Sequence, residues 1–349
     1  MATIYDIAKA ANVSPATVSR VLNGRPGVKA ETVQRIRSVM EADAFQPRWK
    51  VMERNRLLVL LPEHRGALDS GYVSRILSGI CDTTFASGFT LNLRPFVPQL
   101  RNDRELKQIV MREGVVGCII VTLFQGYSLA ERLSLLQIPH VIVGYKNQDD
   151  GIHQVLLDDR EAGANATRYL LSLGHRRIAM VSFRHWDHGH HQRYLGYHEV
   201  MQREGVADHA QCVEADAATV ENGRSAARRL LSLPDRPTAV IVTNEDMAVG
   251  FQSEAEAMGV DVPRGLSIIG FEETERLAYL KTPMTAMRIP AHAMGMEATR
   301  MLFSQLREEA TRPGAVSKRQ ENVAPVAQIV HLPISLVARH TTAGVLDAK

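Results

Sequence analysis

The chain has 349 residues, 45% of them hydrophobic and 23% charged, which is ordinary for a soluble globular protein. This length exceeds one small core, so we expect two or three domains. The longest apolar run, residues 115–124, is too short to span a bilayer, which argues against a membrane protein. Three scattered cysteines argue against a disulfide framework or a cysteine-based zinc site and suit a reducing compartment.

The net charge of +3 hides an asymmetry along the chain. Residues 1–56 contain ten Lys or Arg and five Asp or Glu, a net charge of +5, which leaves −2 for the remainder. A basic end on a slightly acidic body indicates a polyanionic partner, although a solvated Arg-rich segment explains the charge equally well. Asp6 and Lys9 interrupt any secretory signal pattern, so we expect a cytoplasmic protein.

Three short helices are predicted in the first fifty residues. The first starts at Thr3, which has Asp6 three positions on, a pair resembling a capping box. The second starts at Pro15 and is capped by Ser14, because proline at the first helical position loses no hydrogen bond. The third spans about residues 31–44, and its apolar side chains recur with helical spacing.

The second helix has two different faces. Its apolar stripe consists of Val18, Val21 and Leu22. The other stripe offers a methyl, a guanidinium, an amide and two hydroxyls, from Ala16, Arg20, Asn23, Thr17 and Ser19. These groups can contact base edges and phosphates, so the pattern predicts a helix-turn-helix DNA-binding head. On helical spacing alone, however, a plain three-helix bundle with a polar exterior is favoured over this interpretation.

The stretch IYDIAKAANVSPATVSRVLNGRPGVKAETVQRI, residues 4–36, resembles the head domain of the lactose/galactose repressor (LacI/GalR) family of bacterial transcription regulators. By this resemblance Pro15 and Ala16 occupy the specificity positions of the recognition helix, and Arg20 reads a base. The resemblance implies DNA contacts from Thr3, Tyr5, Ser14, Pro15, Ala16, Thr17, Ser19, Arg20, Asn23 and Lys29.

Beyond residue 56, short β-branched or leucine-rich runs alternate with helical stretches. The expected strands include 57–61, 90–94, 117–121, 140–143, 177–182, 239–243 and 266–270. This alternation predicts an α/β fold with parallel, doubly wound sheets covered on both faces. No phosphate-binding loop, dinucleotide fingerprint or nucleophile elbow follows a strand, so we do not expect an enzyme and expect no cofactor.

The body continues the family resemblance in segments such as YLLSLGHRRIAMV, AVIVTNEDMAVGF and LSIIGFEETE. It implies a two-lobed, periplasmic-binding-protein-like body with three crossovers and a ligand in the cleft. The expected division is a head at 1–46, a linker at 47–56, a body at 57–340 and a tail at 341–349. Lobe one is expected at about 57–155 and 285–323, and lobe two at about 156–284 and 324–340.

In such folds ligands bind beyond the carboxyl ends of the strands. Four polar residues that match effector positions of the family are expected there, namely Asp158, Arg193, Asn244 and Glu272. A guanidinium, an amide and carboxylates suit a polyhydroxylated ligand. Tyr72, Val73 and Trp186 are further candidates for contact with this ligand. For any one of these residues alone, a surface turn or salt bridge is favoured, but four matching positions together favour contact with a ligand. The family usually has Asp where this chain has Glu272, which bears on the choice of ligand.

Residues 184–193, RHWDHGHHQR, contain four histidines but no Cys and no His-x₃-His spacing. We therefore expect no metal site and interpret this segment as a loop at the edge of the cleft. The linker is shorter than the family's hinge helix and lacks its small residue and leucine. Arg48 and Lys50 are candidates for phosphate contact, and Val51 and Met52 for a minor-groove wedge, unless they pack against the lobe.

Together these features predict a ligand-responsive transcription regulator, a repressor, that binds a near-palindromic operator as a homodimer. Its expected effector is sugar-like. A nucleoside-like or other small metabolite is the alternative, and a soluble sugar-binding protein without a DNA role is the alternative from another class.

Overall fold

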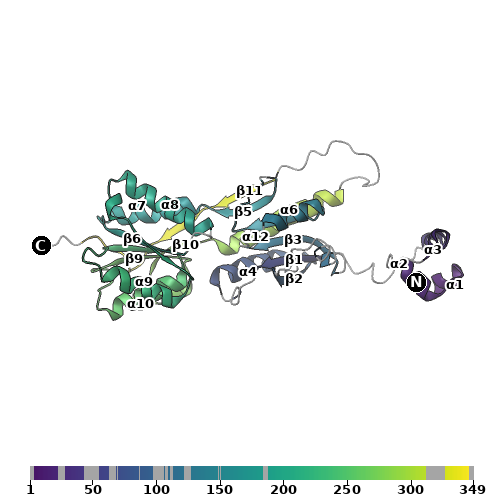
Figure 1. Ribbon diagram of the computed structural model, residues 1–349, viewed down its shortest axis with the longest axis horizontal. Coiled ribbons are helices and arrows are strands. Elements are labelled where there is room, and N and C mark those ends of the chain that lie inside the picture. Colours follow the sequence, from purple (N-terminus) through teal and green to yellow (C-terminus); the bar gives the residue numbers. More distant parts are fainter. Residues whose placement is uncertain are drawn as a thin grey trace.

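The computed structural model describes residues 4–22, 28–42, 55–62, 68, 70–85, 87–96, 106, 109–110, 113–121, 127–147, 149, 151–183, 188–311 and 327–345. Figure 1 shows a small helical head and two α/β lobes. The α/β class with two parallel-sheet lobes is confirmed. None of the helices in the described ranges is both long and apolar enough to cross a membrane.

The head consists of three helices, α1 (Ile4–Ala10), α2 (Pro15–Leu22) and α3 (Ala30–Ala42). They enclose a small core in which Ile7, Val18 and Ile36 are fully buried. The turn between α1 and α2 places Asn12 at φ 51°, a left-handed conformation that asparagine tolerates better than most residues. The apolar stripe expected on the second helix thus packs inward, at least through Val18.

Lobe one contains a six-stranded sheet. Its strands lie in the order β11 (Ile329–Leu332), β5 (His153–Leu157), β4 (His140–Val143), β3 (Val115–Val121), β1 (Arg56–Leu61) and β2 (Thr90–Pro95), all parallel. Helices α4 (Gly71–Phe85) and α12 (Ala291–Thr311) cover one face, and α6 (Tyr127–Leu135) covers the other. Because both faces are covered, Leu57 to Leu60 are all buried, which explains their uninterrupted apolar run.

Lobe two repeats this plan with a second six-stranded sheet. The order is β12 (Ser335–Val337), β10 (Thr285–Arg288), β9 (Ser267–Phe271), β8 (Ala239–Val242), β6 (Ile178–Phe183) and β7 (Gln211–Ala215), with only β12 antiparallel to its neighbour. Helices α7 (Asp159–Ser172) and α8 (His188–Arg203) cover one face, and α9 (Val220–Leu231) and α10 (Glu245–Ala257) the other. The short α11 (Glu275–Ala278) and a 3₁₀ turn (Ala207–His209) complete the lobe.

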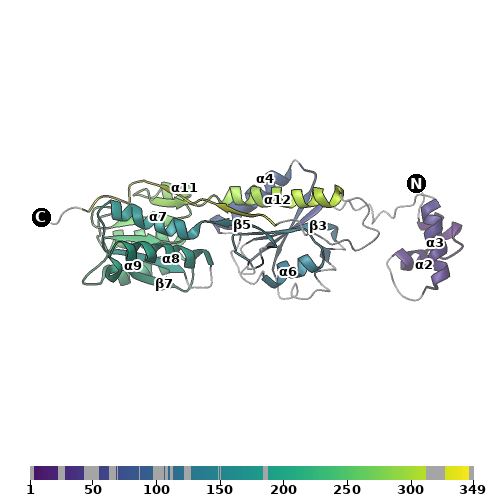
Figure 2. The ribbon, with the colours of Figure 1, turned by 90° about the horizontal axis from the view of Figure 1, so that it is seen from above.

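The chain passes between the lobes three times, but at positions that differ from the expected boundaries. Strand β10 pairs with β9, so residues 285–288 belong to lobe two rather than lobe one. Strand β11 pairs with β5, so residues 329–332 belong to lobe one rather than lobe two. The crossovers therefore lie at residues 158, 289–290 and 333–334. Figure 2 shows the yellow C-terminal strands running across the junction of the lobes.

Candidate functional site

The second helix of the head, α2, presents a polar face. Ser14 caps α2, because its Oγ accepts a hydrogen bond from the Thr17 amide at 3.1 Å and lies 2.8 Å from Thr17 Oγ1. Ala16 and Arg20 are exposed on the helix, whereas Val18 between them is buried. At these two positions the stripe predicted to contact DNA is therefore exposed and does not pack into the core of the head.

The other predicted DNA contacts are described less completely. Pro15 is the first residue of α2 and is exposed, and Lys29 is exposed directly before α3. Tyr5 and Ser19 are placed by their backbones on α1 and α2. Six candidates lie outside the described residues, namely Thr3, Asn23, Arg48, Lys50, Val51 and Met52.

A buried guanidinium lies at the carboxyl edge of the lobe two sheet. Arg193, only 4% exposed, donates from Nε to Asp159 Oδ1 at 2.8 Å and from Nη1 to the Thr243 carbonyl at 2.7 Å. Its guanidinium also lies 4.5 Å from the centroid of the Phe271 ring, a cation–π contact. Arg193 thereby ties together the start of α7, the end of β8 and the end of β9.

Close packing of α7 against α8 places this arginine. A Cβ on Gly163 would lie 2.0 Å from the carbonyl oxygen of Arg193, and one on Gly196 would lie 1.9 Å from that of Arg160. Real side chains cannot approach backbone so closely, so glycine is required at both positions. The two glycines let the helices approach until Asp159 and Arg193 meet.

Glu272 and Asn244 lie beside Arg193. Asn244 caps α10 by accepting from the Met247 amide at 3.2 Å, and its Nδ2 donates to Glu272 Oε1 at 3.5 Å. Glu272 has φ 64°, a conformation that is uncommon for a residue with a side chain and that often marks functional sites. Burial raises the pKa of the Glu272 carboxyl to about 7, although Arg193 opposes this rise.

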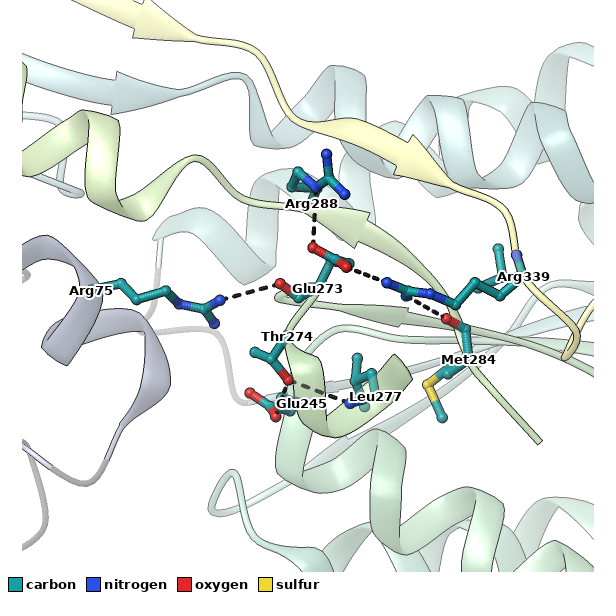
Figure 3. Close-up of polar contacts among 9 residues, drawn as sticks. Arg75, Glu245, Glu273, Thr274, Leu277, Met284, Arg288 and Arg339 are labelled. Carbon is teal, nitrogen blue, oxygen red and sulfur yellow. Dashed lines mark hydrogen bonds and ion pairs between the residues drawn. The ribbon is translucent and has the colours of Figure 1, made fainter. Parts of the chain in front are cut away.

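The lobes touch directly next to these residues. Arg75 on α4 of lobe one donates from Nη1 to the carbonyl of Glu273 in lobe two at 3.2 Å, as Figure 3 shows. A Cβ on Gly71 of α4 would lie 3.3 Å from Oε2 of Glu245 in lobe two. Arg193, Asn244 and Glu272 thus lie at the edge of lobe two that faces lobe one.

Comparison with known proteins identifies the family. Residues 3–48 match the family described as bacterial regulatory proteins, lacI family, and residues 167–342 match the periplasmic binding protein-like domain. The HTH-type transcriptional regulator MalR of Streptomyces coelicolor is 31% identical over 355 residues, which cover 98% of this chain and 96% of MalR. The chain belongs to the LacI family of bacterial transcription regulators. The resemblance seen in the sequence is therefore confirmed, and the family consists of DNA-binding regulators rather than enzymes.

Solved structures of two transcription regulators share this fold. The structure titled transcriptional regulator CelR-cellobiose complex matches with a TM-score of 0.68 at 22% identity, over 98% of this chain and 100% of that one. The lac repressor dimer bound to operator and the anti-inducer ONPF matches with a TM-score of 0.70 at 21% identity, over 98% and 99%. At this identity the match demonstrates the fold.

Three predicted effector residues have contacts of their own, and of these only the buried Val73 speaks against the prediction. Asp158 is about half exposed, with its Oδ1 3.1 Å from His331 Nδ1, and its contact with an effector stays a prediction; the neighbouring Asp159 pairs with Arg193. Val73 is buried in the hydrophobic core. The Tyr72 hydroxyl lies 3.5 Å from Met294 Sδ.

The histidine-rich segment is partly helical rather than a loop. Helix α8 begins at His188, so Arg193 lies in its second turn. His190 is buried, with Nδ1 2.8 Å from Thr243 Oγ1. Trp186 lies outside the described residues. Among the residues that are described, no group of His, Cys, Asp or Glu could hold a metal ion.

Sequence reasoning missed four residues of this region, namely Arg75, Asp159, Thr243 and Glu245. Thr243 contacts Arg193 through its main-chain carbonyl, which any residue would supply. Arg75 is 198 positions from its partner Glu273, a separation that no local pattern spans. Asp159 could have been found, because acidic side chains are favoured in the first turn of a helix.

Proposed function

We propose that this LacI-family regulator is a ligand-responsive repressor, which binds a near-palindromic operator as a homodimer. A sugar-like effector that binds between the lobes changes its affinity for the operator. The observation that carries the proposal is the group formed by Arg193, Asn244 and Glu272 at the edge of lobe two that faces lobe one. The same chain carries a DNA-binding head, so sensing and DNA binding are covalently linked.

On DNA, the exposed face of α2 enters the major groove. Arg20 donates to a guanine edge, and Ala16 contacts a thymine methyl, while nearby hydroxyls and Lys29 contact phosphates. One head reads one half-site, and a two-fold symmetric pair of heads reads a near-palindrome. Reading both half-sites in this way requires a dimer. Because the DNA is in the cytoplasm, that is where we place the protein.

Between the lobes, the effector contacts suit a polyol. The Asn244 amide both donates and accepts, and the Glu272 carboxyl can do either, because its pKa is raised to about 7. Such groups pair with adjacent hydroxyls of a sugar. CelR, a protein of the same fold, has been solved as a complex with cellobiose, which supports this ligand class. A nucleoside-like metabolite would use its ribose hydroxyls in the same way.

The effector acts by shifting populations. A ligand that contacts both lobes favours the lobe orientation in which those contacts form. If that orientation differs in DNA affinity, ligand and operator are thermodynamically coupled. The coupling is reciprocal, so operator DNA must change effector affinity by the same factor.

Two measurements test the proposal. Thermal unfolding in the presence of a panel of sugars and nucleosides should show a raised midpoint with one class of ligand, because binding to the folded state stabilises it. Selection of duplexes from a random pool should yield a near-palindrome whose affinity falls with salt. The proposal fails if no duplex is preferred, with or without the ligand that raises the midpoint. A sedimentation mass of one chain on the selected duplex would exclude the dimer.

A further inference from the structure

The loop of residues 272–274, between β9 and α11, is held on two sides. The Glu273 carboxylate accepts hydrogen bonds from Arg288 Nε at 3.1 Å and from Arg339 Nη2. Thr274 donates to Glu245 Oε1 at 2.5 Å and caps α11. Figure 3 shows Arg288 and Arg339 reaching Glu273 from different elements of lobe two, and Thr274 of the loop itself contacting Glu245. The loop that presents Glu272 is therefore built around Glu273.

Both arginines come from segments next to a crossover. Arg288 is the last residue of β10, directly before the chain passes into lobe one. Arg339 follows β12, which the chain reaches on its return, and its Nη1 also donates to the Met284 carbonyl at 2.9 Å. The hydrogen bonds and charges of the two arginines outweigh burial and keep the pKa of Glu273 below its ordinary value. Glu273 thus remains ionised and holds the loop to the strands that lead between the lobes.

Lobe one also contacts Glu273, through the main-chain carbonyl of that residue. Arg75 donates from Nη1 to the Glu273 carbonyl at 3.2 Å and from Nε to the Gly71 carbonyl of its own helix at 3.1 Å. The second bond orients the guanidinium on α4. The Arg75 charge also lies close enough to Glu272 to favour ionisation of that carboxyl. One arginine of lobe one therefore contacts the loop and influences its effector residue.

We propose that Arg75, acting through Glu273, is a positioning residue of the effector response: it latches the Glu272 loop to lobe one and increases the population of the closed arrangement of the lobes. This inference rests on the proposed function, in which Glu272 faces the effector. A ligand that needs the closed arrangement binds more weakly in proportion to the fraction of molecules that are closed. Loss of the latch therefore weakens effector binding without removing any group that touches the effector.

The test compares Arg75→Met, which keeps the unbranched stem, with Arg75→Lys, which keeps a cationic donor. Arg276→Met is the matched control, because Arg276 pairs with Asp246 at 2.6 Å within lobe two and both side chains are about half exposed. Small-angle X-ray scattering of the full-length protein without ligand should give a larger radius of gyration for Arg75→Met than for wild type. Arg75→Lys should lie between them, and Arg276→Met should match wild type.

Titration with cellobiose, glucose, ribose and adenosine supplies the second readout. We expect the dissociation constant of whichever probe binds to rise about tenfold in Arg75→Met, to recover partly in Arg75→Lys, and to stay unchanged in Arg276→Met. Wild-type values for Arg75→Met in both experiments would overturn the latch. If no probe binds even the wild type, the proposed sugar effector fails, and scattering alone then decides the latch: an unchanged radius of gyration overturns it.

Discussion

Arg193 and Asp159 form a buried ion pair between two helices, with 2.8 Å between Nε and Oδ1. Removing one partner of such a pair leaves a charge buried without compensation. We therefore expect Asp159→Ala to lower the free energy of unfolding by about 3–5 kcal/mol, as measured by urea denaturation. Glu199→Ala, which breaks the exposed pair with Arg160 on the same two helices, should barely move the unfolding curve. Equal effects of the two substitutions would contradict the structural role of the buried pair.

Gly163→Ala should separate α7 from α8. The added methyl would meet the Arg193 carbonyl oxygen at 2.0 Å, so one of the helices must move. Overpacking of this kind costs about 1–3 kcal/mol and should displace Arg193, which reduces the shift in thermal midpoint caused by the effector. Gly344→Ala is the control, because the nearest atom to its new methyl lies 3.7 Å away. A stable Gly163→Ala protein with a full effector response would argue against this packing constraint.

Arg20→Ala should weaken operator binding by about 1–3 kcal/mol if the guanidinium reads a base edge. Arg20 is exposed on α2, so the substitution removes no core contact. Competition between the selected operator and single-base variants is the decisive measurement, because a base contact changes sequence preference at one position. An equal loss of affinity for all duplexes would instead indicate that Arg20 contacts a phosphate.

Glu272→Gln should stabilise the protein increasingly as the pH rises. The pKa of Glu272 is raised to about 7 from its usual 4.5, so between these values the folded chain holds a proton that the unfolded chain releases. The contribution of Glu272 to stability therefore falls as the pH rises through this window. Glutamine loses no proton, so the difference in thermal midpoint between variant and wild type should be larger at pH 8 than at pH 5. A difference independent of pH would contradict the raised pKa.

Three buried or half-buried histidines should make the protein less stable as the pH falls, which is the opposite of the effect of Glu272. Burial lowers the pKa values of His140, His153 and His175 below 6.5. Below about pH 6.5 the unfolded chain therefore binds protons that the folded chain does not, and stability falls with the pH. Thermal midpoints between pH 7 and pH 5, measured in the Glu272→Gln background to remove its opposing contribution, should fall steadily. His140→Gln in that background should show a shallower fall, and an unchanged slope would exclude His140 as a contributor.

Local chemistry was sufficient to predict much of the fold. Ser14 and Pro15 start α2 at the predicted residue, because capping and the missing proline amide act within one turn. The strand expected at 57–61 appears as Arg56–Leu61, since a strand buried on both faces must be continuously apolar. The three helices of the head and the alternating α/β body follow from such short-range patterns, whereas the helix-turn-helix assignment came from the family resemblance.

The polar residues at the junction of the lobes were predictable only in part. Arg193, Asn244 and Glu272 were identified from the family resemblance and from their positions after strands, and they lie together in the structure. Asp159 was missed, because only the packing of α8 against the start of α7 decides which of two adjacent acidic side chains meets Arg193. Sequence spacing contains no information about that packing.

The sequence by itself determined the DNA-binding head, the α/β class of the body and three of the residues between the lobes. Only the tertiary structure decided that residues 285–288 and 329–332 belong to opposite lobes from those expected, and that Arg75 meets Glu273 across 198 positions. The reason is physical: caps, turns and apolar runs act between neighbours in the chain, whereas strand pairing and contacts between lobes depend on which distant surfaces bury each other.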